Sequence, residues 1–177
     1  MAAVAVPIQI DEISSGSTPS AIAQARELLL EYGRFVVSHP AAAQFCYGSL
    51  QREAAGLPGS YTDRGGGCLI ATVASVPAGF VAFQPAPGPL AHHSWELKRL
   101  WVRPQARGHH LGRQLTQAVL DRAAHAGRTA VYLDTVPQAM PAAHRLYLEM
   151  GFTPCKPYND NPIPELAYLV KFLNSDR

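Results

Sequence analysis

Residues Leu97 to Leu115 read LKRLWVRPQARGHHLGRQL, and this stretch decides how the rest of the chain is interpreted. It predicts a strand that runs into a short turn of Arg and Gly residues, which then opens a helix. Backbone N–H groups in the first helical turn lack intrahelical partners, and the helix dipole gives them partial positive charge. Glycine permits close approach, and Arg103, Arg107 and Arg113 add charge-assisted hydrogen bonds. The stretch therefore predicts an anion site that fits a pyrophosphate.

A simpler interpretation of the same stretch remains open. Arg-Gly pairs are common, and a strand, a solvated basic turn and a helix also form an ordinary packing unit. The spacing favours the anion site, because the chain follows the pattern V-x-P-x-x-R-G-x-G-x-G at Val102, Pro104, Arg107, Gly108 and Gly112. The pattern departs only at His110, which stands at the second glycine.

This spacing resembles motif A of the GNAT superfamily, the acyl-CoA-dependent N-acetyltransferases, in which the turn binds the pyrophosphate of CoA. The resemblance implies acetyl-CoA as the co-substrate. It assigns the cofactor contacts to two neighbouring runs, 100–102 and 107–113: Leu100, Trp101, Val102, Arg107, Gly108, His109, His110, Leu111, Gly112 and Arg113.

A second motif supports the resemblance independently. Residues Ala143 to Phe152, AHRLYLEMGF, resemble motif B of the same superfamily, A-x-x-L-Y-x-x-x-G-F. The two motifs have the expected order and distance. A weaker resemblance to a bacterial-type GNAT group, whose substrates are mostly unknown, rests on Phe45 to Gln84 and on Pro157 to Pro162.

The resemblance also implies catalytic roles. Acetyl transfer to an amine needs a base for the ammonium, donors for the oxyanion and an acid for the thiolate. Glu96, six residues before Val102, matches a glutamate base, although a surface residue beside Lys98 is the alternative. Tyr147 matches the motif B tyrosine that protonates the leaving thiolate, although a core aromatic is the alternative. The backbone from Leu100 to Val102 is expected to stabilise the oxyanion during direct attack in a ternary complex.

The acceptor is expected to be a small-molecule or peptide amine. Candidate contacts are Tyr61, Asp63, Asp134 and Tyr158, since they fall on predicted loops or strand ends. Met140 stands where many family members have an asparagine that helps to bind CoA. This departure and His110 keep a rival hypothesis open, a non-catalytic acyl-CoA-binding or interaction module, and behind it a relic that binds no CoA.

Composition narrows the classes of function. The chain has 177 residues, 47% hydrophobic and 16% charged, which predicts one globular domain over residues 1–177. A net charge of +2 argues against a nucleic-acid partner. The start, MAAVAVPIQIDEISSG, resembles no secretion signal, and no stretch is apolar enough for a membrane span, so a cytoplasmic location is expected. The resemblance leaves a homodimer open.

Neither the histidines nor the cysteines form a metal-binding pattern. His92-His93 and His109-His110 are adjacent pairs whose side chains are expected to point apart, so no metal is predicted. The three cysteines lack CxxC spacing and are expected to be buried thiols: Cys46, Cys68 and Cys155.

The periodicity predicts a mixed α/β fold, with about seven strands in a central sheet and four flanking helices. Such an order is what a GNAT fold requires. Expected strands span 4–10, 68–75, 79–84, 95–102, 130–134, 152–157 and 166–172, with a hairpin turn at 76–78. The expected helices run from Pro19 to before Pro40, over 42–55, from residue 111 to the Gly127 cap, and over 140–150.

Overall fold

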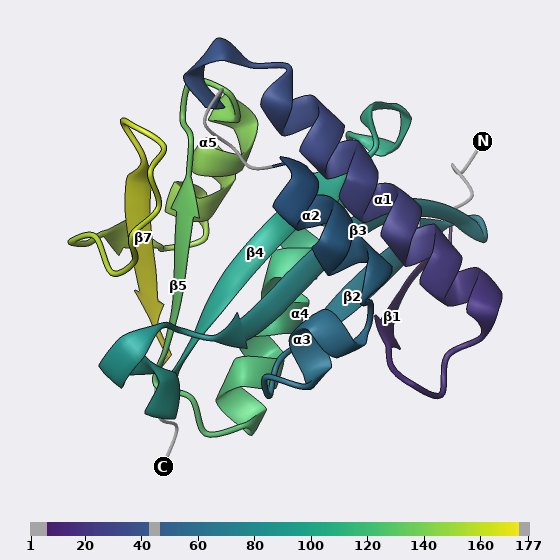
Figure 1. Cartoon of the computed structure of the whole chain (residues 1–177), viewed down its shortest axis with the longest axis horizontal. Helices are drawn as coiled ribbons and strands as arrows, with labels where there is room; N and C mark the ends of the chain where they lie inside the picture. The colour runs from purple at the N-terminus through teal and green to yellow at the C-terminus, as the bar shows by residue number, and fades with distance from the viewer. Residues whose placement is uncertain (1–6, 43–46, 174–177) are drawn as a thin grey trace, which may run out of the picture.

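The computed structural model describes residues 7–42 and 47–173 and contains a seven-stranded mixed sheet, ordered β1-β2-β3-β4-β5-β7-β6 (Figure 1). Neighbouring strands are antiparallel except β4 and β5, which are parallel. The strands are β1 (Ile8–Ile13), β2 (Gly67–Val73), β3 (Val76–Pro85), β4 (Ser94–Val102), β5 (Ala130–Thr135), β6 (Thr153–Pro154) and β7 (Ala167–Phe172). The α-helices are α1 (Pro19–Val37), α2 (Tyr47–Ala55), α3 (Gly59–Thr62), α4 (Leu111–His125) and α5 (Pro141–Glu149).

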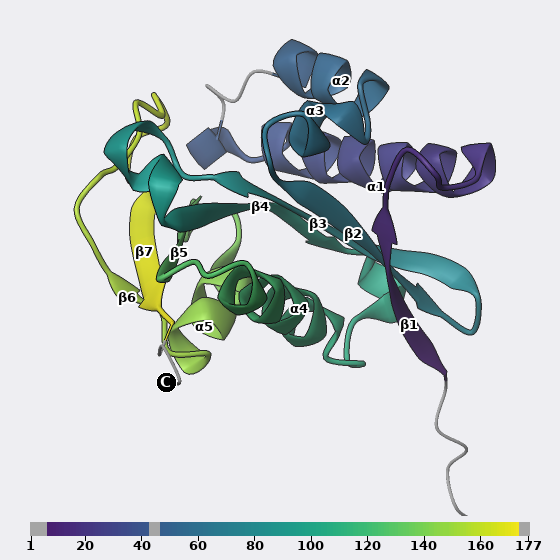
Figure 2. The same ribbon diagram turned by 90° about the horizontal axis from the view of Figure 1, so that it is seen from below.

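Helices cover both faces of the sheet, which confirms the predicted mixed α/β architecture. Figure 2 shows α1, α2 and α3 on one face, and α4 and α5 on the other. Each face has its own hydrophobic core, because successive residues of a strand point to opposite faces. The α1 side buries Leu28, Leu29, Leu50, Ile70 and Phe80, and the α4 side buries Leu69, Val81, Leu97, Leu115 and Val119.

The two long helices begin and end where the sequence predicts. Thr18 caps α1 by accepting a hydrogen bond from the Ala21 N–H at 3.2 Å, and Pro19 occupies the first turn. At the C-terminal end of α4, Gly127 adopts a φ of 69°, the left-handed conformation expected just past a helix. Local capping chemistry therefore fixes the ends of these helices.

The hairpin between β2 and β3 forms, but the predicted turn at 76–78 is wrong. The turn lies at Ala74 and Ser75, which adopt φ values of 49° and 65°. A two-residue turn with both central residues left-handed matches the twist of the flanking strands. Pro77 stays inside β3, beside a register shift where the ladder is already irregular.

Four flanking helices were predicted, but the described residues contain five α-helices. The stretch 57–67, in which no helix was predicted, contains the single turn α3. Tyr61 is 1% exposed and anchors this turn in the core on the α1 side. A helix of one turn depends on such tertiary contacts and not on its own propensity.

Three further boundaries differ from the prediction. The first strand was expected over 4–10, but β1 ends at Ile13, and residues 4–6 lie outside the described residues. The second helix was expected over 42–55, but α2 begins at Tyr47, and residues 43–46 lie outside the described residues. Only two residues form β6, since Pro154 and Pro157 lack the N–H groups that continue a ladder.

The centre of the sheet opens between β4 and β5. These strands pair only from Ser94 to Glu96, while β5 continues to Thr135 against β7. On its other edge β4 carries a bulge, in which Arg99 and Leu100 lie opposite a single residue of β3 and Arg99 adopts a φ of 60°. Within residues 7–42 and 47–173, β4 beyond Glu96 therefore has no strand partner on the β5 side.

The described part of the chain contains no helix with the length and apolarity needed to cross a bilayer.

Candidate active site

A cavity of about 740 Å³ lies where β4 leaves β5, bounded by the start of α4, by α5 and by the end of α1. Apart from Arg103 and His109, every residue predicted to contact the cofactor lines this cavity, and the side chain of His109 is exposed. The stretch that the sequence singles out therefore forms one continuous wall. We call this space the first cavity.

The N-terminus of α4 supplies hydrogen-bond donors to the first cavity. Gln114 is the first residue of this helix whose N–H reaches back, to the His110 carbonyl at 3.1 Å. The N–H groups of the three preceding residues, 111–113, therefore have no intrahelical partner. Two guanidinium groups add positive charge: Arg107 lies over the Trp101 ring at 5.9 Å, and Arg113 pairs with Glu149 at 3.0 Å. Such an arrangement can hold a phosphate or pyrophosphate.

The turn before α4 explains the glycines of the motif. Gly108 and His110 adopt φ values of 90° and 56°, the left-handed region that favours glycine. His110 therefore keeps the backbone conformation of the family pattern while adding a side chain to the cavity wall. Gly112 has a different role, because a Cβ there would lie 3.1 Å from a methyl group of Leu146. It permits α4 to pack closely on α5.

The expectation that Arg103 binds the anion is wrong. Its guanidinium donates to Glu31 of α1 at 2.7 Å and to the Pro77 carbonyl at 2.9 Å, and it lines neither described cavity. Glu31 also accepts a hydrogen bond from Trp101 Nε1 at 3.0 Å. Arg103 therefore ties the end of β4 to α1.

A second cavity of about 400 Å³ adjoins the first. The two share Leu100, at the β4 bulge, and Met140, just before α5. The polar residues of its lining come from α1, α2, β4, β5, α5 and the segment after β6, and they include Tyr32, Lys98, Arg99, Asp134, Tyr147, Asn159 and Asn161. One reactant can therefore lie in each cavity, next to the two residues that both cavities share.

Tyr147 lies in the wall of the second cavity and also belongs to the core. Its ring meets Phe152 edge-on, with centroids 5.6 Å apart. Its hydroxyl has no hydrogen-bond partner among the described residues. Burial raises the pKa of Tyr147 well above that of a free phenol, so the hydroxyl stays protonated at neutral pH. It is a hydrogen-bond donor held at the edge of the cavity.

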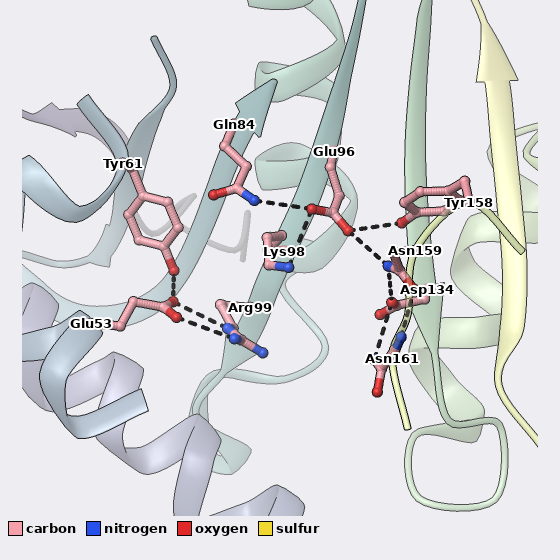
Figure 3. Close-up of polar contacts among 10 residues, drawn as sticks. All are labelled: Glu53, Tyr61, Gln84, Glu96, Lys98, Arg99, Asp134, Tyr158, Asn159 and Asn161. Atoms are coloured by element: carbon pink, nitrogen blue, oxygen red, sulfur yellow. Dashed lines mark hydrogen bonds and ion pairs between the residues drawn. The ribbon is translucent and has the colours of Figure 1, made fainter. Parts of the chain in front are cut away.

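Glu96 is buried at 3% exposure, which rules out the alternative of a surface residue. Figure 3 shows its carboxylate surrounded by donors. Gln84 and Lys98 donate to Oε2 at 3.1 and 3.2 Å, and Tyr158 and Asn159 donate to Oε1 at 3.0 and 3.3 Å. All four acceptor positions of the carboxylate are thus filled, and Glu96 itself lines neither cavity.

Asp134, at the end of β5, is the second carboxylate of the network. Its Oδ2 accepts hydrogen bonds from Asn159 at 2.8 Å and from Asn161 at 3.2 Å. Asn159 therefore joins Asp134 to Glu96 (Figure 3). Asp134 lines the second cavity, and its Oδ1 has no partner within the described ranges. This oxygen is available to a ligand.

The other predicted acceptor residues lie behind the cavity wall or away from it. Tyr61 donates to Glu53, which in turn accepts two hydrogen bonds from Arg99 at 3.1 and 3.2 Å. Tyr61 can therefore influence a bound acceptor only through Glu53 and Arg99. Asp63 is an exposed residue at the end of α3 and lines neither cavity.

Tyr158 also lies behind the wall and supports Glu96. Its pKa is raised by burial and by the neighbouring carboxylates, so its hydroxyl remains a donor at neutral pH.

Sequence reasoning missed the amide side chains that assemble the network. Gln84, Asn159 and Asn161 hold the two carboxylates, yet none was assigned a role. The one signal for the two asparagines is the segment Pro157 to Pro162, in which two asparagines and an aspartate stand between prolines.

The histidine pairs do not converge on a site, and the described residues contain no group of three or more His, Cys, Asp or Glu side chains that could hold a metal ion. Cys68 is buried as expected, and burial raises the pKa of its thiol to about 12. Cys155 is only half-buried, and Cys46 lies outside the described residues.

Comparison with known proteins points to one family. Residues 23–152 match the model of the acetyltransferase (GNAT) family. Over 91 residues the chain is 40% identical to an uncharacterized N-acetyltransferase of Schizosaccharomyces pombe, a match that covers 51% of this chain and 53% of that protein. The chain thus spans about half the length of this curated relative.

Solved structures share the fold. An acetyltransferase of Streptococcus agalactiae superposes with a TM-score of 0.73 at 22% identity, over 94% of this chain and 98% of that one. A Salmonella typhimurium protein, whose structure contains its cofactor acetyl-CoA, gives a TM-score of 0.64 at 19% identity, over 96% and 94% of the two chains.

Proposed function

Because the chain belongs to the acetyltransferase (GNAT) family, we propose that it transfers the acetyl group of acetyl-CoA to a primary amine. The observation that carries this proposal is the pair of adjoining cavities. One has an anion-binding end at α4, the other has a carboxylate with an open oxygen, and they meet at Leu100 and Met140. Reactants held on both sides of this junction are arranged for direct attack in a ternary complex.

The residues of the first cavity fit acetyl-CoA. The open N–H groups at the start of α4, together with Arg107 and Arg113, match the charge of a pyrophosphate. The unpaired edge of β4 from Leu100 to Val102 offers backbone donors and acceptors to an amide-containing arm. Bound acetyl-CoA supplies the activated acetyl carbonyl. Backbone N–H groups at the β4 bulge then stabilise negative charge on its oxygen.

Two further side chains complete the proposed chemistry. Tyr147 donates its proton to the leaving sulfur, because its buried hydroxyl is protonated and unpartnered among the described residues. Glu96 is proposed as the base that receives the ammonium proton. Since four donors fill its carboxylate, this requires one of them to give way, and Lys98 and Asn159 are the two that also line the second cavity. Asp134 Oδ1 is the proposed contact for the ammonium itself.

Calorimetry and turnover assays test the proposal together. Acetyl-CoA should bind with micromolar affinity, and Arg107→Ala or Gly108→Glu should weaken binding at least tenfold. Arg64→Ala is the matched control, because this exposed arginine lies after α3 and lines neither cavity. Release of free CoA should then depend on added amine.

Two outcomes would contradict the proposal. Binding without amine-dependent release would favour the non-catalytic acyl-CoA-binding module, for which Met140 at the junction is the specific structural argument. Absence of binding would remove the enzyme interpretation and leave an interaction role.

A further inference from the structure

The positive charges of the second cavity are already neutralised from behind its wall. Lys98 Nζ lies 3.2 Å from Glu96, whose side chain is 4% exposed. Arg99 makes two hydrogen bonds to Glu53 (Figure 3), and although burial opposes it, Tyr32 and Glu53 raise the pKa of Arg99. Neither cation therefore offers an uncompensated charge to a ligand.

The negative charges of the same cavity have no such compensation. Among the residues that the structure describes, Asp134 receives hydrogen bonds only from the neutral amides of Asn159 and Asn161. Asp160 lines the cavity as well and forms no ion pair with any residue of the described ranges. After the two neutralised pairs are set aside, two carboxylates remain. Because a cavity with low-dielectric walls focuses the field of its charges, this space attracts cations and repels anions.

The remainder of the cavity wall is apolar. The apolar residues of the lining include Val36, Leu97, Leu100, Val136, Met140 and Ile163. The volume of about 400 Å³ lies at the lower end of the range for small-molecule sites, roughly 300–1,000 Å³. A hydrocarbon or aromatic group of modest size fits beside the carboxylates.

We infer that the acceptor is a small cationic amine that carries no carboxylate. This inference rests on the proposed acetyl transfer and names the substrate class of the same site. The ammonium contacts Asp134 Oδ1, and the apolar part of the molecule lies along the wall formed by Val36, Val136 and Ile163. A free α-amino acid is disfavoured, because its carboxylate would face Asp134 and Asp160 without a free cation to balance it.

Acceptors that differ in carrying a carboxylate but differ little in size test whether the cavity disfavours a negative charge. Phenylalaninamide and phenylalanine differ little in shape, but only the second carries a carboxylate, and phenethylamine lacks the group altogether. With saturating acetyl-CoA, kcat/KM should be at least tenfold higher for the amide and for phenethylamine than for the amino acid. The histidinamide, histidine and histamine series repeats the comparison with another side chain.

Two variants locate the effect at the carboxylates. Asp160→Asn should reduce the preference for the amide over the acid severalfold, because kcat/KM should rise for the acid and fall for the amide. Asp134→Asn should raise KM for every amine and also reduce the preference. Asp11→Asn is the matched control, since Asp11 is exposed on the edge strand β1 and should change neither.

The outcomes separate this inference from the function on which it rests. Turnover that is equal or faster with the amino acids would overturn the inference and leave acetyl transfer standing. A preference for the amides that survives both variants would also overturn it. No turnover with any amine, despite bound acetyl-CoA, would overturn the transfer and the inference together.

Discussion

At the scale of single residues, the hydroxyl of Tyr147 can be removed without changing the packing around it. Tyr147→Phe keeps the ring against Phe152 and deletes only the unpartnered oxygen. If this hydroxyl protonates the leaving sulfur, kcat should fall by about 100-fold, while the Kd for acetyl-CoA stays within about twofold. Steady-state CoA release and calorimetry measure the two quantities. Unchanged turnover from pH 6 to pH 10 would end the assignment as the acid.

The variant Glu96→Gln tests whether Glu96 acts as the base or only holds the surrounding side chains in place. As the base, Glu96 matters most where the amine is protonated, so the loss of kcat/KM in Glu96→Gln should be greatest at low pH and shrink as pH rises. Gln84→Leu is the control, because it removes one donor and leaves the carboxylate. A uniform loss at every pH, matched by a lower melting temperature, would mean that Glu96 only positions Lys98, Tyr158 and Asn159.

The partners of Glu96 show how far residue-level prediction could reach. Motif spacing singled out Glu96, Tyr147 and one wall of the first cavity, because each motif is a short run of sequence with fixed spacing. The saturation of Glu96 could not be predicted in this way. Two of its four donors, Tyr158 and Asn159, come from a segment more than 60 residues away in sequence, and only the fold brings them together.

At the scale of elements, Glu31 of α1 binds the end of β4 through Arg103 and Trp101. Although burial opposes it, the hydrogen bonds from these two residues lower the pKa of Glu31. A carboxyl group with a lowered folded-state pKa stabilises the protein above its unfolded pKa, and this contribution disappears as pH falls through the folded value. The contacts of Glu31 with Arg103 and Trp101 should therefore stabilise the fold strongly at neutral pH and weakly in acid.

The variant Glu31→Gln measures how much these contacts contribute to the free energy of unfolding. At pH 7 the variant should lose about 1 kcal/mol of unfolding free energy, and the difference from the parent protein should shrink toward pH 3. Urea unfolding at both pH values gives the comparison. Glu27→Gln is the control, because Glu27 also lies 3.4 Å from Arg103 but is 62% exposed. A loss that stays constant with pH would show that packing, and not charge, holds α1 to β4.

Elements with strong local signals were predicted well, and those fixed by distant contacts were not. The cap at Thr18 and the apolar stripe of α4 define their helices from nearby residues alone. The hairpin was misplaced because Pro77 and its neighbours look like a turn, although left-handed Ala74 and Ser75 make it. The helix α3 depends on the burial of Tyr61, which no local pattern reveals.

At the scale of the whole molecule, the site depends on the early separation of β4 from β5. Two sequence motifs flank this opening, and Arg113 of the first reaches Glu149 of the second at 3.0 Å. Their order along the chain predicted the sheet of about seven strands and the position of the cofactor. The second cavity was harder to predict, because its walls come from α1, α2, β4, β5, α5 and the segment after β6.

The shared wall at Leu100 and Met140 predicts the kinetic mechanism of the whole protein. Both reactants should be bound before transfer, because the two cavities share the lining residues Leu100 and Met140. Neither Cys68 nor Cys155 lines either cavity, so neither is placed to carry the acetyl group. Initial rates with both substrates varied should give intersecting double-reciprocal lines. Desulfo-CoA should compete with acetyl-CoA and not with the amine. Parallel lines, or an acetylated protein isolated in the absence of amine, would replace the ternary complex with a covalent route.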